Sequence, residues 1–272
     1  MRSAGNYLSY LLFRLAWSVG RLLGLERLRR LLEALGRTVA RFDWRRRDVV
    51  ADNLRSAFPQ WSEARIATTA ARVYANWGRI AAEMVHVAAI ADEQALARLV
   101  PVFEAIDDVA AEGRALLLLT AHTGNFELLS RLCGLSGRRV VVFNRPMHNR
   151  FIARFLAAER AKAGVGELNR ALDLREALRE LRRGVLLAVP LDQNQAPGRG
   201  LFVNMFGRKA ATSPLLARLS VSTGAPVLPV FSVWRDDKLV PVIGDVIWPE
   251  DVGPTEPGRR AKELRLTALT AR

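Results

Sequence analysis

Residues 115–132 read ALLLLTAHTGNFELLSRL and join a short apolar run, a polar turn and a stretch with helical apolar spacing. The run 115–121 has the length of a strand, and its unbroken leucines are typical of a strand buried on both faces. Asn125 is a favoured capping residue for a helix that starts at FELLSRL. The segment therefore predicts a strand, a turn and a helix in succession, which is the repeating unit of an α/β sheet.

The same alternation continues towards the C-terminus. Apolar runs of strand length and stretches of helical spacing follow one another, which predicts strands at 139–144, 185–191, 226–234 and 239–247 and helices at 147–163, 172–183 and 213–222. We therefore predict the α/β class, with a largely parallel central sheet flanked by helices.

Towards the N-terminus the chain reads as helical. Residues 62–112 have helical apolar spacing, and residues 7–25 form an apolar stretch that Arg14 and Arg21 interrupt. Arginines seven residues apart share a helix face, so this stretch predicts an amphipathic helix on a membrane surface and disfavours a spanning one. The alternative is a helix packed on the protein's own core. We expect no cleaved signal peptide, because a small-residue cleavage site is missing.

These patterns divide the chain into three parts. We predict a membrane-associated amphipathic helix at 1–25, a helical region at 26–112 and the α/β core at 113–272.

The composition points to an anionic partner. The 272 residues carry 41 Lys and Arg against 27 Asp and Glu, a formal net charge of +14. Nucleic acid, a membrane surface or a phosphorylated substrate would each suit this charge. Arginines cluster between residues 41 and 55, directly after the first helix and beside Phe42 and Trp44, which favours a membrane interface. No nucleic-acid-binding motif is recognisable, so we expect no nucleic-acid partner. With Cys133 as the only cysteine and three scattered histidines, we expect neither a disulfide nor a metal site.

Polar residues follow the predicted strands at the edge where open α/β sheets bind ligands. His122 and Glu127 follow the first strand, Arg145 the second, and Asp192 with Gln193 the third in sequence. Neutral His122 is the candidate general base, and a carboxylate on its second nitrogen would fix its tautomer and stabilise imidazolium. We predict that Glu127, in the first turn of the helix, is that carboxylate. A structural histidine, and a structural ion pair between Arg145 and Asp192, are the alternatives.

The stretch AHTGNFELL resembles the H-x-x-x-x-D/E motif of the lysophospholipid acyltransferase superfamily, in the form found in lipid A late acyltransferases. Further stretches agree in order over residues 45–250: VVADNLRSAFP, FNRPMHN, GVLLAVPLDQN and VNMFGRKAATSPLLARLSVSTGAPVLPVF. The resemblance implies a glycerol-3-phosphate acyltransferase-like fold. It also implies residues beyond the C-terminal segment KELRLTALTAR, so that this chain would be shorter than its relatives.

For the chemistry, the resemblance implies that His122 deprotonates an acceptor hydroxyl while Glu127 orients the ring. The hydroxyl would attack the thioester of an acyl carrier protein or coenzyme A directly, with no bound cofactor. The positions expected to bind substrate or the oxyanion are Asn125, Arg145, Asp192, Gln193, Phe206, Gly207 and Arg208. Met205 and Lys209 depart from the family's Phe-Phe-Gly segment and from the proline that follows it.

The expected function is therefore O-acylation of a phosphorylated glycolipid, a lipid A precursor above all, on the cytoplasmic face of a bacterial inner membrane. The expected partners are acyl carrier protein, anionic membrane lipid and the glycolipid acceptor. Two alternatives stay open at this point. One is another lipid acceptor, such as a phosphatidylinositol mannoside or an ornithine-type lipid. The other is a non-catalytic basic protein that binds membranes or nucleic acid.

Overall fold

The structure of the protein is a computed structural model that describes residues 2–111, 115–144, 147–169, 174–196, 198–250 and 266–267. The chain forms two compact units. The first comprises residues 1–90 with 206–208, and the second comprises residues 91–205 with 209–272.

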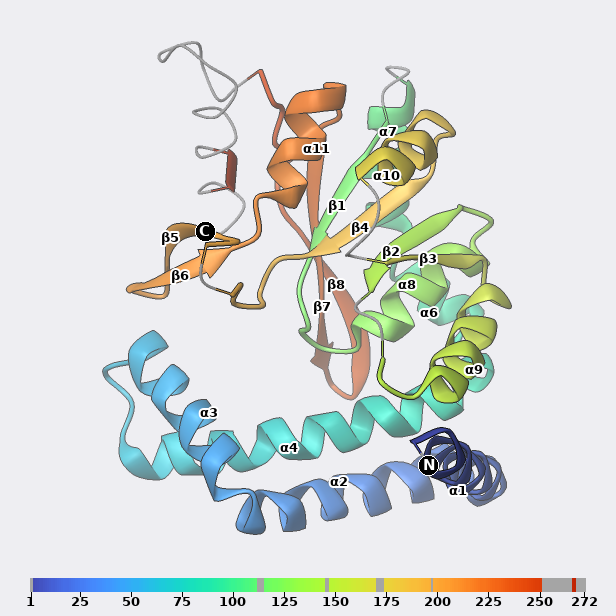
Figure 1. The fold of residues 1–272 in the computed structure, drawn as a ribbon, viewed down its shortest axis with the longest axis vertical. Coiled ribbons are helices and arrows are strands. Elements are labelled where there is room, and N and C mark those ends of the chain that lie inside the picture. The colour runs from blue at the N-terminus through green and yellow to red at the C-terminus, as the bar shows by residue number, and fades with distance from the viewer. Residues whose placement is uncertain are drawn as a thin grey trace. The chain divides into compact units, whose positions relative to one another are not determined.

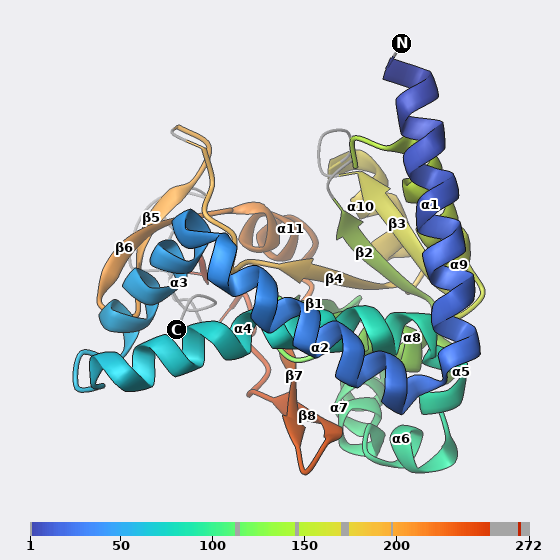
Figure 2. The same ribbon diagram turned by 90° about the horizontal axis from the view of Figure 1, so that it is seen from below.

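The first unit is built of helices, and its described elements are α1 (Arg2–Leu23), α2 (Leu25–Phe42), α3 (Trp44–Ala57), α4 (Glu63–Val85) and α5 (Val87–Ile90). Helices α2 and α4 lie side by side (Figures 1 and 2). Two glycines permit this approach. A Cβ atom on Gly78 would lie 2.1 Å from the carbonyl oxygen of Leu32, and one on Gly36 would lie 2.3 Å from that of Tyr74. Backbone contact at both points fixes which side of α2 faces α4.

Helix α1 has the predicted amphipathic pattern over 22 residues. Its apolar row is exposed, with side chains between 45% and 87% accessible: Leu8, Leu11, Leu12, Leu15, Val19 and Leu22. The structure therefore does not show the alternative, in which this apolar row packs on the protein's own core. A hydrogen bond ties α1 to the end of α4: the ring Nε2 of His86 lies 3.0 Å from the carbonyl oxygen of Gly20 in α1. None of the described helices is long and apolar enough to cross a membrane.

The second unit holds both sheets, except that Phe206, Gly207 and Arg208 belong to the first unit. Its described elements are α6 (Glu93–Ala97), α7 (Val100–Ala111), β1 (Leu117–Thr120), α8 (Phe126–Leu135), β2 (Val140–Asn144), α9 (Arg150–Ala161), β3 (Val165–Asn169), α10 (Leu174–Arg182), β4 (Leu186–Pro190), β5 (Leu201–Met205), β6 (Arg208–Thr212), α11 (Leu215–Thr223), β7 (Val227–Arg235) and β8 (Lys238–Ile243). The main sheet has the order β3-β2-β4-β1-β7-β8, and β5 pairs with β6 separately. All neighbours in the main sheet are parallel except β7 and β8.

The predicted α/β class with a largely parallel sheet is thereby confirmed. Strand β3 and the β5–β6 pair were not predicted from the sequence. The β3 sequence VGELN contains Gly, Glu and Asn, which are poor strand formers, and it becomes a strand by pairing with β2 at the sheet edge. A context-dependent edge strand of this kind leaves little signal in the chain itself.

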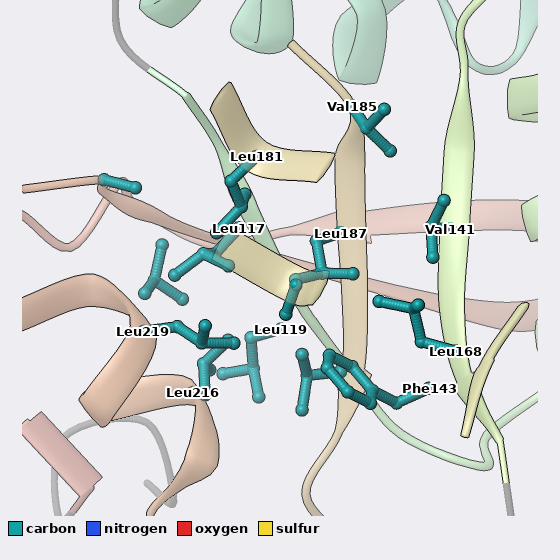
Figure 3. Close-up of a cluster of buried hydrophobic side chains, with 14 of the residues drawn as sticks. Leu117, Leu119, Val141, Phe143, Leu168, Leu181, Val185, Leu187, Leu216 and Leu219 are labelled. Carbon is teal, nitrogen blue, oxygen red and sulfur yellow. The ribbon is translucent and has the colours of Figure 1, made fainter. Parts of the chain in front are cut away.

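The two faces of the sheet have different roles. Odd-numbered residues of β1, such as Leu117 and Leu119, join Leu187 of β4 and side chains of α10 and α11 in one buried cluster (Figure 3). Even-numbered residues, such as Leu118, point to the side of α8. The first face is filled core, and the second carries the cavity described below.

Candidate active site

His122 and Asp192 meet at the carboxyl ends of two neighbouring strands. Strands β1 and β4 pair in parallel, with Thr120 opposite Pro190. His122 and Asp192 each lie two residues beyond these strand ends. The ring Nδ1 of His122 lies 2.9 Å from Oδ1 and 3.2 Å from Oδ2 of Asp192. The backbone N–H of His122 also donates to Oδ2 of Asp192, at 3.1 Å. The structure thus brings together two residues that are 70 positions apart.

This contact defines the ring's chemistry. An Nδ1 proton donated to Asp192 leaves Nε2 as the free acceptor of the imidazole. The side-chain amide nitrogen of Gln193 lies 3.5 Å from Nε2, at the open side of the ring. Burial would raise the pKa of the Asp192 carboxyl, but the hydrogen bonds and charge of His122 outweigh burial and hold that pKa below its ordinary value. Asp192 is therefore a stable anion beside the ring.

The turn that carries His122 is tightly constrained. Gly124 has φ +53°, and a Cβ atom there would lie 2.3 Å from the carbonyl oxygen of Ser232 in β7. The Ser232 hydroxyl donates to the carbonyl oxygen of Thr123 at 3.0 Å. As predicted, the Asn125 side chain caps α8 by accepting from the Leu128 N–H at 2.9 Å. Only glycine fits the third position of the His-Thr-Gly-Asn turn, because both the backbone conformation and the neighbouring strand exclude a side chain.

Glu127 lies in the first turn of α8 as predicted, but its carboxylate does not contact the His122 ring. It accepts two hydrogen bonds from Arg160 of α9, one of them from Nε at 2.9 Å and the other from Nη2. Arg160 also donates to Glu167 of β3. The structure therefore does not show the predicted contact between Glu127 and His122, and the carboxylate on the ring is that of Asp192.

A buried guanidinium explains this difference. Arg160 and Glu127 are each only 8% exposed, so either charge alone would be costly. Burial lowers the pKa of Arg160, but the hydrogen bond and charge of Glu127, together with Glu167, raise it above its ordinary value. Arg131, one turn after Glu127, is also buried, and burial lowers its pKa. Glu127 is held where two buried arginines need a counter-charge.

A cavity of about 100 Å³ lies beside His122, between α8 and the sheet. Most of its lining is apolar, including Leu118, Leu129, Val142 and Ala188, while Glu127 and Arg160 form a polar part of the wall. Cys133 also lines it, and burial raises the pKa of that thiol to about 12. The thiol is thus protonated and unreactive at neutral pH. Among the residues that the structure describes, no group of three His, Cys, Asp or Glu side chains could hold a metal ion.

The other predicted site residues lie elsewhere or have other contacts. Arg145 lies outside the described residues. Phe206 and Gly207 form the turn between β5 and β6, with φ of 49° and 77°, and Arg208 begins β6. Positive φ at both central residues is typical of a type I′ hairpin turn.

Sequence reasoning missed Arg160 and Glu167. Arg160 follows Leu156 by four residues, and these two are the buried residues of α9. A charged residue in register with a core-facing leucine indicates a buried ion pair, and this signal was present in the sequence.

Comparison with known proteins identifies a family that matches most of the chain. The family described as bacterial lipid A biosynthesis acyltransferase matches residues 2–243. The chain belongs to this family. The family resemblance predicted from the motifs is thereby confirmed.

Two relatives give the degree of similarity. The chain is 29% identical over 201 residues to the lipid A biosynthesis lauroyltransferase of Escherichia coli (strain K12). The aligned segment covers 72% of this chain and 65% of that protein. It is 22% identical over 208 residues to lipid A biosynthesis acyltransferase 2 of Shigella flexneri, covering 76% of this chain and 66% of that protein. The aligned part spans just under two thirds of the length of each relative.

Proposed function

We propose that this member of the family transfers a fatty acyl chain from a thioester to a hydroxyl of a lipid A precursor, with His122 as general base. The observation that carries the proposal is the 2.9 Å contact between His122 Nδ1 and Asp192, beside an apolar cavity, in a chain of this family. Asp192 acts as the positioning residue, in the role that the sequence assigned to Glu127.

In the proposed reaction the acceptor hydroxyl gives its proton to Nε2 of His122 as its oxygen bonds to the thioester carbonyl carbon. The tetrahedral intermediate then collapses, the carbon–sulfur bond breaks, and the leaving sulfur takes the proton from imidazolium to depart as a thiol. The Asp192 carboxylate stabilises the imidazolium between these steps. Thioesters react with hydroxyls without a covalent enzyme intermediate, and the buried, protonated Cys133 suits that route.

Other groups have supporting roles in this proposal. The apolar cavity wall would receive the acyl chain next to the thioester carbonyl. The Gln193 amide, 3.5 Å from Nε2, would donate to the oxyanion. Arg145 remains our candidate for the phosphate of the acceptor, and Phe206 with Arg208 for contact with lipid. The donor is proposed to be acyl carrier protein or coenzyme A, both of them co-substrates.

The site of action is proposed to be the cytoplasmic face of a bacterial inner membrane. The exposed apolar row of α1 and the formal charge of +14 both support attachment to an anionic lipid surface. The same charge would attract an acidic carrier protein.

The proposal is tested by incubating purified protein with a lipid A precursor and either an acyl carrier protein thioester or an acyl coenzyme A. Mass spectrometry should show one added acyl chain, and folded His122→Ala protein should produce none. Phosphatidylinositol mannoside and ornithine lipid serve as competing acceptors. Transfer only to one of these would replace the lipid A assignment, and no turnover of either thioester by folded wild-type protein would overturn the enzymatic proposal.

A further inference from the structure

Helix α2 carries a second exposed apolar row. Its members are spaced by four, four and three residues, so they lie along one side of the helix, and they are Leu31 (54% exposed), Leu35 (54%), Val39 (43%) and Phe42 (78%). We call this set the α2 row. Leu28, three residues before Leu31, lies on the same side of the helix and is buried, and Ala40 is buried on the side that carries Gly36. The helix therefore presents more apolar surface than its own packing uses.

The α2 row cannot turn inward without breaking the helix pair. The backbone contacts at Gly36 and Gly78 keep the neighbouring side of α2, the side of Gly36, against α4. Exposure of the α2 row is consequently a fixed property of the first unit. Contiguous exposed apolar surface on a folded unit marks a place where something else binds.

Arginines run beside the α2 row. Arg27, Arg30, Arg37 and Arg41 are all exposed, and their spacing of three, seven and four residues places them on a neighbouring side of the same helix. The two acidic residues of α2 pair with Arg29 (Glu26, at 2.7 Å) and Arg37 (Glu33, at 3.7 Å), so Arg27, Arg30 and Arg41 supply the excess positive charge. The surface beside the α2 row is therefore strongly basic.

The same character continues onto the next helix. Trp44 is 57% exposed and Val49 59% exposed, and Arg45, Arg46 and Arg47 are exposed between them. Aromatic rings beside arginines are enriched where a protein meets the headgroup level of a bilayer. A row of apolar side chains flanked by cations is the pattern of a helix that lies in that interface.

We infer that the α2 row is a second lipid-contacting surface, which rests among the acyl chains of an anionic bilayer while the flanking arginines contact lipid phosphates. Other occupants fit less well. An acidic protein would match the arginines but leave the α2 row in water, and a second copy would bring two rows of arginines together. The inference goes beyond the proposed acyl transfer, since it concerns a surface apart from His122 and Asp192.

The first test places a reporter in the α2 row of the full-length protein. Leu35→Cys is labelled with an environment-sensitive fluorophore, while the native Cys133 is only 3% exposed and stays unlabelled. On vesicles of phosphatidylethanolamine and phosphatidylglycerol, lipids with a nitroxide on the acyl chain should quench the label. A label at Asn76→Cys, an exposed position on α4, should be quenched far less. Vesicle-bound protein whose position-35 label stays in water would overturn the inference.

The second test removes the α2 row. Combined Leu31→Ser, Leu35→Ser and Phe42→Ser should weaken binding to the anionic vesicles by at least about tenfold. Leu135→Ser, at a comparably exposed leucine on α8, should bind like wild type. Circular dichroism checks that each variant folds. Equal binding of wild type to neutral vesicles would refute the role of the arginines. Sedimentation equilibrium tests self-association. If wild type is a dimer, the triple variant is a monomer and lipid does not quench the label, the α2 row serves self-association instead.

These measurements contain neither acyl donor nor acceptor. Failure of the lipid-surface inference therefore leaves the proposed catalytic reaction untouched, and failure of acyl transfer leaves the lipid-surface inference untouched.

Discussion

The structure assigns different roles to the two carboxylates near His122, and this difference can be measured. Replacing Asp192 by Asn removes the negative charge that lies 2.9 Å from the His122 ring while keeping the shape of the side chain. At an effective dielectric constant of about 40, between that of water and that of a protein surface, the lost attraction to imidazolium is about 3 kcal/mol. We therefore expect kcat to fall about a hundredfold, with a smaller loss of Tm than the Glu127 replacement causes.

Replacing Glu127 by Gln should act on stability instead. The change leaves the buried Arg160 with Glu167 alone, and breaking a buried ion pair costs about 3 kcal/mol at the lower end. For a unit of this size we expect Tm to fall by roughly 6 to 12 °C. Asp107→Asn, at an exposed acid paired with Arg138, is the matched control and should change neither quantity.

The assay is initial-rate acyl transfer at saturating donor, together with thermal unfolding of each variant. A double-mutant cycle completes it, because residues that act as a unit are strongly non-additive. Asp192→Asn in a His122→Ala background should cost little beyond His122→Ala alone. Folded Glu127→Gln protein without activity, beside fully active Asp192→Asn protein, would refute the reasoning.

The pKa of Asp192 adds a test that needs no substrate. Because this pKa is lower in the folded protein than its ordinary value of 3.8, the carboxylate contributes stability above that pH. That contribution is lost as the pH falls from about 3.8 through the lower folded pKa. Urea unfolding of wild type at pH 6 to 3 should therefore show a larger acid loss than unfolding of Asp192→Asn. Identical acid curves would contradict the pairing.

Three further predictions follow from single contacts. Cys133 should resist a thiol reagent at pH 8 in the native protein and react fully in urea, because burial raises its pKa to about 12; rapid native reaction would contradict its burial. Gly78→Ala should destabilise the first unit by about 1 to 3 kcal/mol through its clash with Leu32, whereas Gly5→Ala, with open space around it in α1, should cause no loss of stability in thermal unfolding. Val142→Phe should narrow the cavity and lower kcat/KM for long-chain donors more than for acetyl donors, and equal losses would remove this cavity as the acyl site.

The sequence alone determined the repeating strand and helix units, the family motif and the helix cap that follows His122. These features depend on neighbouring residues, because apolar spacing and the cap at Asn125 act within a few positions of the chain. The amphipathic character of α1 was readable for the same reason. The exposure of the α2 row could not be predicted from the sequence, because a helix with apolar residues on more than one side does not reveal which side is buried.

The tertiary structure decided which carboxylate contacts His122. Asp192 reaches the ring because β4 pairs with β1 in the sheet, although 70 residues separate the two side chains. Glu127 is close to His122 in sequence, yet its carboxylate is drawn to Arg160, a charge that α9 buries beside it. Strand order and the neutralisation of buried charge are long-range effects, and spacing along the chain carries no measure of either.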